Sequence, residues 1–332
     1  MINYKLSFIE SPSEIEINLN SSKSESNRLL IIKSLSDNKI ELENLSHAND
    51  TVLLKNLIRS SSQNIWDAED AGTTMRFLTS FLAITKQGVL LTGTERMKKR
   101  PIKILVDALN KIGAEISYTE KDGYPPIKIN RKISQIKESI SIRGDISSQY
   151  ISSLLMIAPV LPNGLKIDVI SPFYSKPYVM MTLNLMKKFG IKYDLSEDSI
   201  SINNQEYKSG SYKIESDWSA ASYWYSFISI NKKLKEIKLK GLREHSFQGD
   251  QVIKKIMTLF NVETLYDKDG IILRKKDFDC DYLELDFKDC LLILSLANTI
   301  LDLKSSIASR SFAYNNWYPP LNFNSLIGLQ LP

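Results

Sequence analysis

A short segment near the N-terminus combines the residue types that bind anions. Residues 21–28 read SSKSESNR and place two cations, Lys23 and Arg28, among four serines just before an apolar run. Serine hydroxyls donate hydrogen bonds without bulk, and an arginine can hold a phosphate or a carboxylate through two parallel hydrogen bonds. A serine at such a place can also simply cap a helix. The segment alone leaves both interpretations open.

Donor-rich segments recur where further helices are expected to begin. Helix N-termini carry unpaired N–H groups and about half a positive charge, so they favour anions. The segments are Ala71-Gly72-Thr73-Thr74 with Arg76 one turn later, Ser147-Ser148-Gln149, and YSKPY (174–178). Taken singly, each start is explained by capping or close packing, and a structural role is the interpretation that we favour for Arg76. Their recurrence favours one shared anion site.

An internal repeat predicts the elements that position these residues. Four segments combine a helical period, a Gly or Asn stop and a short alternating strand, at residues 29–42, 104–116, 182–193 and 253–264. The stops are Asn38, Gly113, Gly190 and Asn261, spaced by about 75 residues. Gly and Asn tolerate the left-handed conformation in which many helices end. With further helices expected over 71–85, 147–161 and 219–230, the sequence predicts an α/β fold of repeated units.

Length and composition limit the class of protein. A chain of 332 residues exceeds what one core usually organises, so two domains are expected. The net charge of +5 is spread along the chain without a stripe of arginines and aromatics, which fits a small anionic ligand as well as nucleic acid. Two histidines and two late cysteines, Cys280 and Cys290, argue against a His-rich metal site and a disulfide framework. The N-terminus does not resemble a signal peptide and no apolar run could span a bilayer, so we expect a cytoplasmic protein.

The donor-rich segments resemble, in order, the motifs of one family. SSKSESNRLLI (21–31) is similar to the N-terminal motif of the 5-enolpyruvylshikimate-3-phosphate (EPSP) synthases, the 3-phosphoshikimate 1-carboxyvinyltransferases. The matching segments that follow are DAGTTMRFLTS (70–80), LTGTERMKKRPIKILVDALNKIGAEI (91–116), GDISSQYISSLLMIAPV (144–160), SKPYVMMTLNLMKKFGI (175–191), ESDWSAASYW (215–224) and FQGD (247–250). Several motifs in the family's order make the resemblance specific.

The resemblance implies both a fold and a reaction. Each of two domains would be built from βαβαββ units with pseudo-threefold symmetry, with the active site in the cleft between them. Residues 21–218 would form the middle domain with three units, and residues 1–20 with 219–332 the other, incomplete domain. The reaction implied is transfer of the enolpyruvyl group of phosphoenolpyruvate to the 5-hydroxyl of shikimate 3-phosphate, with release of phosphate, in the shikimate pathway to chorismate and the aromatic amino acids. A monomer without metal or organic cofactor is expected.

Matching of the motifs assigns roles to individual residues. Lys23 would contact both substrates and assist proton transfer. The residues implied to bind shikimate 3-phosphate are Lys23, Ser24, Arg28, Ser147, Ser148, Gln149, Ser175 and Tyr178. Those implied to bind phosphoenolpyruvate are Lys23, Gly72, Arg100 and Gln149. Asp70 stands where the family often has Asn, and its carboxylate is expected to point away from the anion or to cap the helix.

The C-terminal part departs from the family. The run Cys290-Leu291-Leu292 follows LELDFKDC (283–290), where the family has a Pro-Asp pair whose Asp is the general base. Asp286 and Asp289 precede the matching position, so neither takes that role. Residues 304–332 resemble the family only in GLQ, and a truncation or frameshift after about residue 290 is expected because six units of about 75 residues would need a longer chain.

Two alternatives to an active transferase stay open at this point. One is a catalytically impaired remnant that only binds shikimate 3-phosphate, since most of the residues implied to bind that ligand are present. The other is the related transferase that acts on UDP-N-acetylglucosamine. That family uses a cysteine in a loop of the middle domain, whereas both cysteines of this chain lie late, which disfavours it.

Overall fold

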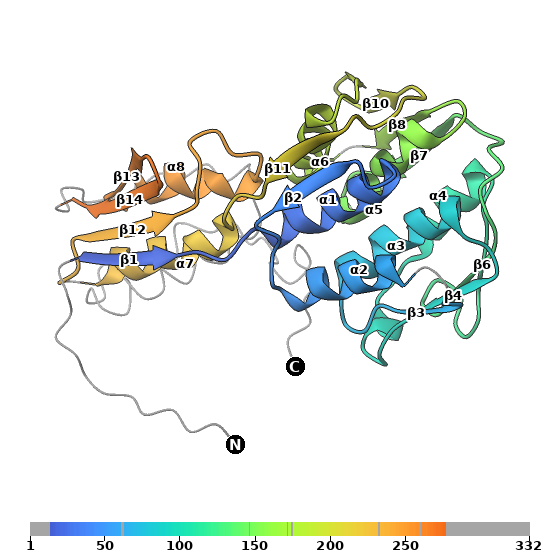
Figure 1. The fold of residues 1–332 in the computed structure, drawn as a ribbon, viewed down its shortest axis with the longest axis horizontal. Coiled ribbons are helices and arrows are strands. Elements are labelled where there is room, and N and C mark those ends of the chain that lie inside the picture. Colours follow the sequence, from blue (N-terminus) through green and yellow to red (C-terminus); the bar gives the residue numbers. More distant parts are fainter. Residues whose placement is uncertain are drawn as a thin grey trace, which may run out of the picture.

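The helices and strands of the chain form two lobes, which lie side by side in Figure 1. The computed structural model describes residues 14–276, apart from 61–62, 146, 171, 174, 232 and 259. The first lobe contains three sheets and helices α1–α6, and the second contains one sheet with α7 and α8. Their buried apolar side chains form two separate clusters. No helix within the described ranges is long and apolar enough to cross a membrane.

One arrangement of strands and helices occurs three times. Each four-stranded sheet has its strands in the order first, second, fourth, third along the chain, and only the first pair is parallel. One unit of the first lobe consists of β3 Ile65–Asp67, α3 Gly72–Thr85, β4 Val89–Thr92, α4 Lys103–Ile112, β5 Glu115–Tyr118 and β6 Ile127–Arg131. The next consists of β7 Ser139–Arg143, α5 Ser148–Ile157, β8 Leu165–Ile170, α6 Lys176–Lys188, β9 Asp194–Leu195 and β10 Ser199–Ile202. The unit of the second lobe consists of β1 Glu14–Asn18, α7 Trp218–Ile230, β12 Glu236–Lys240, α8 Ile253–Thr258, β13 Val262–Asp267 and β14 Gly270–Lys275. The predicted α/β fold of repeated units is confirmed.

A shorter unit completes the first lobe. It consists of α1 Lys23–Leu35, β2 Ile40–Glu43, α2 Asn49–Arg59 and β11 Gly210–Lys213. Strand β11 pairs in parallel with β2 although the two lie far apart in the sequence, with Gly210 opposite Ile40. Short 3₁₀ helices also occur at η1 Met97–Lys99, η2 Ala158–Val160 and η3 Gly249–Val252.

The predicted stops of the repeat adopt the left-handed conformation. The backbone angle φ is 61° at Asn38, 121° at Gly113, 87° at Gly190 and 57° at Asn261. Each follows a helix and turns the chain into the next strand or loop, as the residue types predict. Helix α2 was not predicted, because it has neither signal: its N-cap residue Ala48 makes no capping hydrogen bond, and no Gly or Asn ends it.

Three helices of the first lobe pack against one another at its centre. Helices α1, α3 and α5 are in mutual contact, while α2, α4 and α6 pack around them. Small hydroxyl residues allow this close approach: the Ser80 hydroxyl on α3 donates to the Ser153 hydroxyl on α5 over 2.9 Å. The first turns of the central helices carry the donor-rich segments, so helix packing determines where those segments lie.

The chain crosses between the lobes twice, and the two crossings run side by side. The backbone N–H of Ser22 donates to the Glu215 carbonyl (2.8 Å), and that of Asp217 donates to the Asn20 carbonyl (2.9 Å). The buried residues of the first cluster end at Ile214, and those of the second begin at Trp218. This arrangement supports the division into two domains at about residues 20 and 218, which we keep as a proposal.

Candidate active site

Helix α1 begins with a capped turn that presents Lys23. The Ser22 hydroxyl accepts a hydrogen bond from the backbone N–H of Glu25 (3.3 Å), so the capping interpretation of this serine is confirmed. The Lys23 ammonium lies 3.9 Å from a carboxylate oxygen of Asp50, and its side chain is 45% exposed. Lys23 therefore retains access to solvent at the start of a buried helix.

Arg28 lies one turn further into α1 and is only 3% exposed. Its Nε donates to the Thr182 hydroxyl on α6 (2.7 Å), and its Nη1 donates to the Ser24 carbonyl (2.9 Å). Its Nη2 donates to the Ser152 hydroxyl on α5 and to the Tyr178 carbonyl on α6, each over 3.4 Å. The guanidinium therefore joins the first turns of α1 and α6 to the middle of α5.

Arg28 forms no salt bridge with a carboxylate of the described residues. All its hydrogen-bond partners are hydroxyls and carbonyls, and the guanidinium also lies 5.5 Å from the centroid of the Phe77 ring. Burial lowers its pKa to about 10, against a smaller raising effect of Tyr178 and Glu25. A buried charge is costly unless an opposite charge accompanies it. An anionic ligand near α1 would supply that charge.

Two further arginines lie against the start of α3. A Cβ at Gly72 would lie 2.6 Å from Nη1 of Arg76 and closer still to Nη1 of Arg100, so only glycine leaves room for both side chains. Arg76 donates from Nη1 to the Gly72 carbonyl (2.9 Å), while its Nε is buried without a described partner. Partial burial, followed by repulsion from Arg76 and Arg96, lowers the pKa of Arg100. The start of α3 is therefore strongly cationic.

Helix α5 begins beside α3. The Ser147 hydroxyl caps α5 by accepting from the Gln149 N–H (3.3 Å), and the Gln149 amide donates to the Thr73 hydroxyl on α3 (3.1 Å). The Tyr150 hydroxyl donates to the Pro101 carbonyl (2.6 Å), which anchors the loop that carries Arg100. Of the two serines, Ser147 is exposed and Ser148 is buried.

Helix α6 contributes Ser175 and Tyr178. Ser175 is the N-cap residue, and its carbonyl accepts from the Tyr178 N–H (3.2 Å). The Tyr178 hydroxyl donates to a carboxylate oxygen of Asp250, which belongs to the second lobe (2.9 Å). Tyr178 thus contacts Arg28 through its carbonyl and the second lobe through its phenol.

These contacts divide the predicted site residues into two linked groups. Ser24, Arg28 and Tyr178 meet around α1 and α6, and Gly72, Arg100 and Gln149 meet around the starts of α3 and α5. Asp50 links the start of α1 to the second group, because it faces Lys23 and attracts Arg100. Ser147, Ser148 and Ser175 stand at helix starts, Ser147 and Ser148 at α5 and Ser175 at α6.

Several neighbours of the site were missed by reasoning from the sequence. Thr182 and Ser152 accept hydrogen bonds from Arg28, and Asp50 faces Lys23. The only signal for Thr182 was its position one turn after Tyr178 on the same predicted helix. The capping alternative for Asp70 is wrong: Ala71 is the N-cap residue of α3, and the Asp70 carboxylate accepts from the Thr94 hydroxyl.

The position that matches the family's general base lies outside the described residues. Asp286, Asp289 and the run from Cys290 onward also lie outside the described residues. The expected departure from the family motifs after about residue 290 is therefore not tested by the structure. Over the described ranges, His, Cys, Asp and Glu side chains form no group of three or more that could hold a metal ion.

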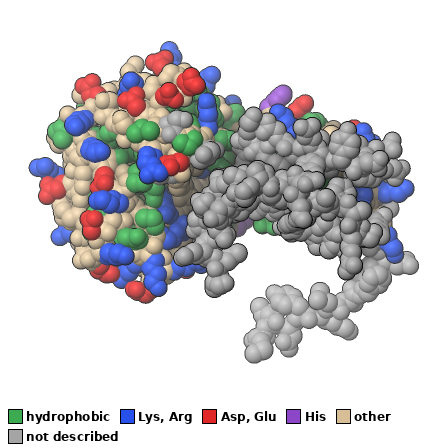
Figure 2. All heavy atoms as spheres, turned by 180° about the vertical axis from the view of Figure 1, so that it is seen from behind, with side chains coloured by type: hydrophobic (Ala, Val, Ile, Leu, Met, Phe, Trp, Pro, Cys, Tyr) green, Lys and Arg blue, Asp and Glu red, His purple; other side chains and the backbone are tan. Residues whose placement is uncertain are grey.

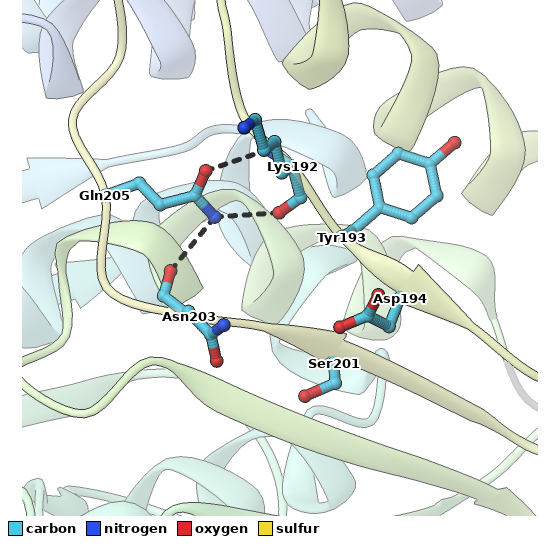
Figure 3. A pocket seen from close by; sticks show the side chains of 6 residues that line it. All are labelled: Lys192, Tyr193, Asp194, Ser201, Asn203 and Gln205. Carbon is cyan, nitrogen blue, oxygen red and sulfur yellow. Dashed lines mark hydrogen bonds between the residues drawn. The ribbon is translucent and has the colours of Figure 1, made fainter.

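A surface hollow elsewhere on the first lobe is separate from this site. Lys192, Tyr193, Asp194, Ser201, Asn203 and Gln205 line it (Figure 3). The Gln205 amide spans it by accepting from the Lys192 N–H (2.8 Å) and donating to the Lys192 carbonyl (2.7 Å). The hydrogen-bonding groups of this amide are therefore used by the Lys192 backbone. None of the predicted site residues lines the hollow.

If Gly72 binds phosphoenolpyruvate as the resemblance implies, its replacement with alanine is expected to weaken that binding by about tenfold and to lower the free energy of unfolding by about 1–2 kcal/mol. The new methyl group would displace the exposed end of the Arg100 side chain and would also press on Arg76, which is only 6% exposed and has no solvent to move into. Titration calorimetry and urea unfolding measure the two quantities. Gly210→Ala is the matched control, because a Cβ there meets Phe189 at an ordinary 3.5 Å. An unchanged affinity in the Gly72 variant would contradict the placement of Arg100 at the ligand.

The fold and this site define the class of protein: a two-lobed α/β protein with cationic helix starts gathered for small anionic substrates. Residues 54–308 match the model of the family described as EPSP synthase (3-phosphoshikimate 1-carboxyvinyltransferase). Among curated proteins, the chain is 43% identical over 297 residues to a 3-phosphoshikimate 1-carboxyvinyltransferase of Bacteroides fragilis, covering 88% of this chain and 71% of the relative. The chain belongs to the EPSP synthase family, whose members are transferases.

A second curated relative and a solved structure are also similar to this chain. A 3-phosphoshikimate 1-carboxyvinyltransferase of Buchnera aphidicola is 36% identical over 302 residues, covering 81% of this chain and 68% of the relative. A solved EPSP synthase of Acinetobacter baumannii is similar in fold, with a TM-score of 0.63 and 18% identity over 79% of this chain and 64% of that one. This chain therefore spans about two thirds of the length of the proteins it matches. The family match extends to residue 308, past the point near residue 290 where the motifs stop.

Proposed function

We propose that this chain binds shikimate 3-phosphate and phosphoenolpyruvate and transfers the enolpyruvyl group to the 5-hydroxyl with release of phosphate. One observation carries the proposal: Arg28 on α1, and Arg76 and Arg100 together at the start of α3, have no salt bridge to a described carboxylate. Both substrates are multiply charged anions, which would balance these charges.

The two groups of site residues suggest one subsite for each substrate. The group around α1 and α6 would hold shikimate 3-phosphate, with Arg28 and Ser24 at its carboxylate. Ser147, Ser148 and Ser175, at helix starts, would bind its phosphate, and Tyr178 would line the pocket. Gly72 and Arg100 would bind phosphoenolpyruvate, and Gln149 would bridge both ligands because its amide lies on the α3 side of α5.

Lys23 is the residue that we propose for proton transfer. Its ammonium lies at the positive end of α1, 3.9 Å from the Asp50 carboxylate, which also attracts Arg100. There it can contact both substrates and give up a proton while the neighbouring cations stabilise the developing charge. The remaining contribution of these residues would be positioning, which brings two anions together despite their mutual repulsion.

A binding-only remnant is the second candidate function. The observation that favours it is the run Cys290-Leu291-Leu292 in place of the family's Pro-Asp pair. Both candidates share the shikimate 3-phosphate subsite and differ in turnover. The names of both curated relatives described above specify 3-phosphoshikimate, which supports this substrate over UDP-N-acetylglucosamine.

Calorimetry with shikimate 3-phosphate, followed by a phosphate-release assay with phosphoenolpyruvate, separates these candidates. The purified full chain of verified mass is used for both measurements. Binding with phosphate release supports the transferase, and binding without release supports the remnant. A chain that is folded by circular dichroism but binds no shikimate 3-phosphate would overturn both.

A monomeric state and a cytoplasmic location complete the proposal. The support is compositional: two late cysteines fit a reducing compartment, and mixed charge fits a protein that acts on small molecules. On the visible face of the first lobe, Lys and Arg side chains alternate with Asp and Glu (Figure 2). Light scattering coupled to gel filtration tests the monomer, and a mass of two chains would contradict it.

A further inference from the structure

The segment from Phe247 to Asp250 belongs to the second lobe and contacts both lobes. Phe247 packs against the hydrophobic cluster of the first lobe. The Gln248 side chain is 1% exposed and donates to the Ser216 carbonyl (2.8 Å) and to the Glu215 carboxylate (3.1 Å), both at the crossing between the lobes. The segment is therefore held firmly where the lobes meet.

Gly249 brings this segment close to the first turn of α6. A Cβ at Gly249 would lie only 2.5 Å from Cβ of Pro177, so a larger residue would push the two segments apart. Pro177 stands between Ser175 and Tyr178, the α6 residues of the proposed shikimate 3-phosphate subsite. Gly249 therefore contacts α6 at its N-terminal turn, where the proposed shikimate 3-phosphate subsite lies.

Asp250 fixes the same turn by hydrogen bonds. Its carboxylate is 3% exposed and accepts from the Tyr178 hydroxyl (2.9 Å) with one oxygen and from the Ser219 hydroxyl on α7 (2.7 Å) with the other. Since Ser219 belongs to the second lobe, Asp250 connects α7 to α6. Tyr178 in turn offers its carbonyl to Arg28. Hydrogen bonds therefore connect α7 to Arg28 through Asp250 and Tyr178.

We propose that residues 247–250 form an inter-lobe latch, in which Asp250 and Gly249 position the first turn of α6 for shikimate 3-phosphate. The inference rests on the proposed function for the identity of the ligand, but not for the latch itself. Asp250 acts as a positioning residue here: its oxygens hold Tyr178 and Ser219, and its charge is not required.

The latch is tested first without any ligand. Hydrogen exchange of the amides in residues 175–182 is expected to be about tenfold faster in Asp250→Ala than in the wild type, because the turn loses its restraint. Asp250→Asn keeps an oxygen for the Tyr178 hydroxyl and is expected to exchange at nearly the wild-type rate. Gly249→Ala should behave like Asp250→Ala, while the control Gly210→Ala should not. Unchanged exchange in both Asp250→Ala and Gly249→Ala would overturn the latch.

Ligand binding supplies the second measurement. Calorimetry is expected to give about tenfold weaker shikimate 3-phosphate binding for Asp250→Ala and Gly249→Ala, and nearly wild-type affinity for Asp250→Asn. Equal loss in Asp250→Asn and Asp250→Ala would overturn the positioning role in favour of an electrostatic one. A wild-type chain that fails to bind would contradict the proposed function, while the exchange result would still decide the latch.

Discussion

Replacing Arg28 with alanine is expected to abolish measurable shikimate 3-phosphate binding, with a dissociation constant raised at least about 100-fold. The side chain is 3% exposed and joins α1, α5 and α6 through four hydrogen bonds. Four of the five N–H donors of Arg28 are used inside the protein, so one remains for a ligand carboxylate. A charged hydrogen bond contributes about 1.5–3 kcal/mol, and its loss together with the loss of the guanidinium charge accounts for a change of this size. Titration calorimetry on the purified variant measures it.

The Arg28→Ala substitution also removes hydrogen bonds inside the protein, so a second variant is needed to separate an effect on binding from an effect on folding. Arg28→Lys keeps the positive charge but offers neither the fork of donors nor their reach to Thr182 and Ser152. We expect this variant to remain folded by circular dichroism and to bind shikimate 3-phosphate at least about tenfold more weakly than the wild type. Full affinity in a folded Arg28→Ala protein would refute the assignment of Arg28 to the ligand.

Replacing Glu25 with glutamine is expected to make the protein less sensitive to alkaline pH. Glu25 is fully buried in the first turn of α1, where it accepts from the Tyr212 hydroxyl (3.3 Å) and the Glu215 N–H (3.1 Å). Burial, and then the nearby Glu215 carboxylate, raise its pKa from 4.5 to about 7, while hydrogen bonding and Arg243 oppose the shift. Between about pH 4.5 and pH 7, the native state therefore holds a proton that the unfolded chain has lost.

The sign of the pH dependence follows from this difference. Below about pH 4.5 Glu25 is neutral in both states, and above about pH 7 it is ionised in both. Between these values the native state binds more protons than the unfolded state, so the stability contributed by Glu25 falls as the pH rises. The full loss is about 3 kcal/mol.

Urea unfolding of wild type and Glu25→Gln at pH 5 and pH 8 checks this prediction. The variant should match the wild type at pH 5 and be more stable by about 2–3 kcal/mol at pH 8. Glutamine fits the site, because its oxygen can accept from Glu215 and its amide can donate to Tyr212. Glu41→Gln, at an exposed position on β2, is the control and should change neither value by more than about 0.5 kcal/mol. A constant difference between the two pH values would contradict the buried, protonated Glu25.

Several helix boundaries could be predicted from the residues around them. Asn38 and Gly190 adopt the left-handed conformation that their positions after helical segments predict, and Ser22 caps α1. Helix α2 escaped prediction because Ala48 provides no cap and no Gly or Asn marks its end. These outcomes share one physical basis. A helix boundary can be predicted from the sequence when the residues around it make the capping contacts, and it cannot be predicted when they do not.

The site residues were found by type, but their partners were not. The sequence determined on its own which residues can bind anions, that they stand at helix starts, and that the chain resembles one family. Only the tertiary structure decided that Arg28 is shared by α1, α5 and α6, that Arg100 lies over Gly72, and that Asp250 reaches α6 from the second lobe. Arg28 and Thr182 are 154 residues apart. Capping and turn preferences act over a few neighbouring residues, whereas contacts across such separations depend on how whole helices pack, which no local pattern specifies.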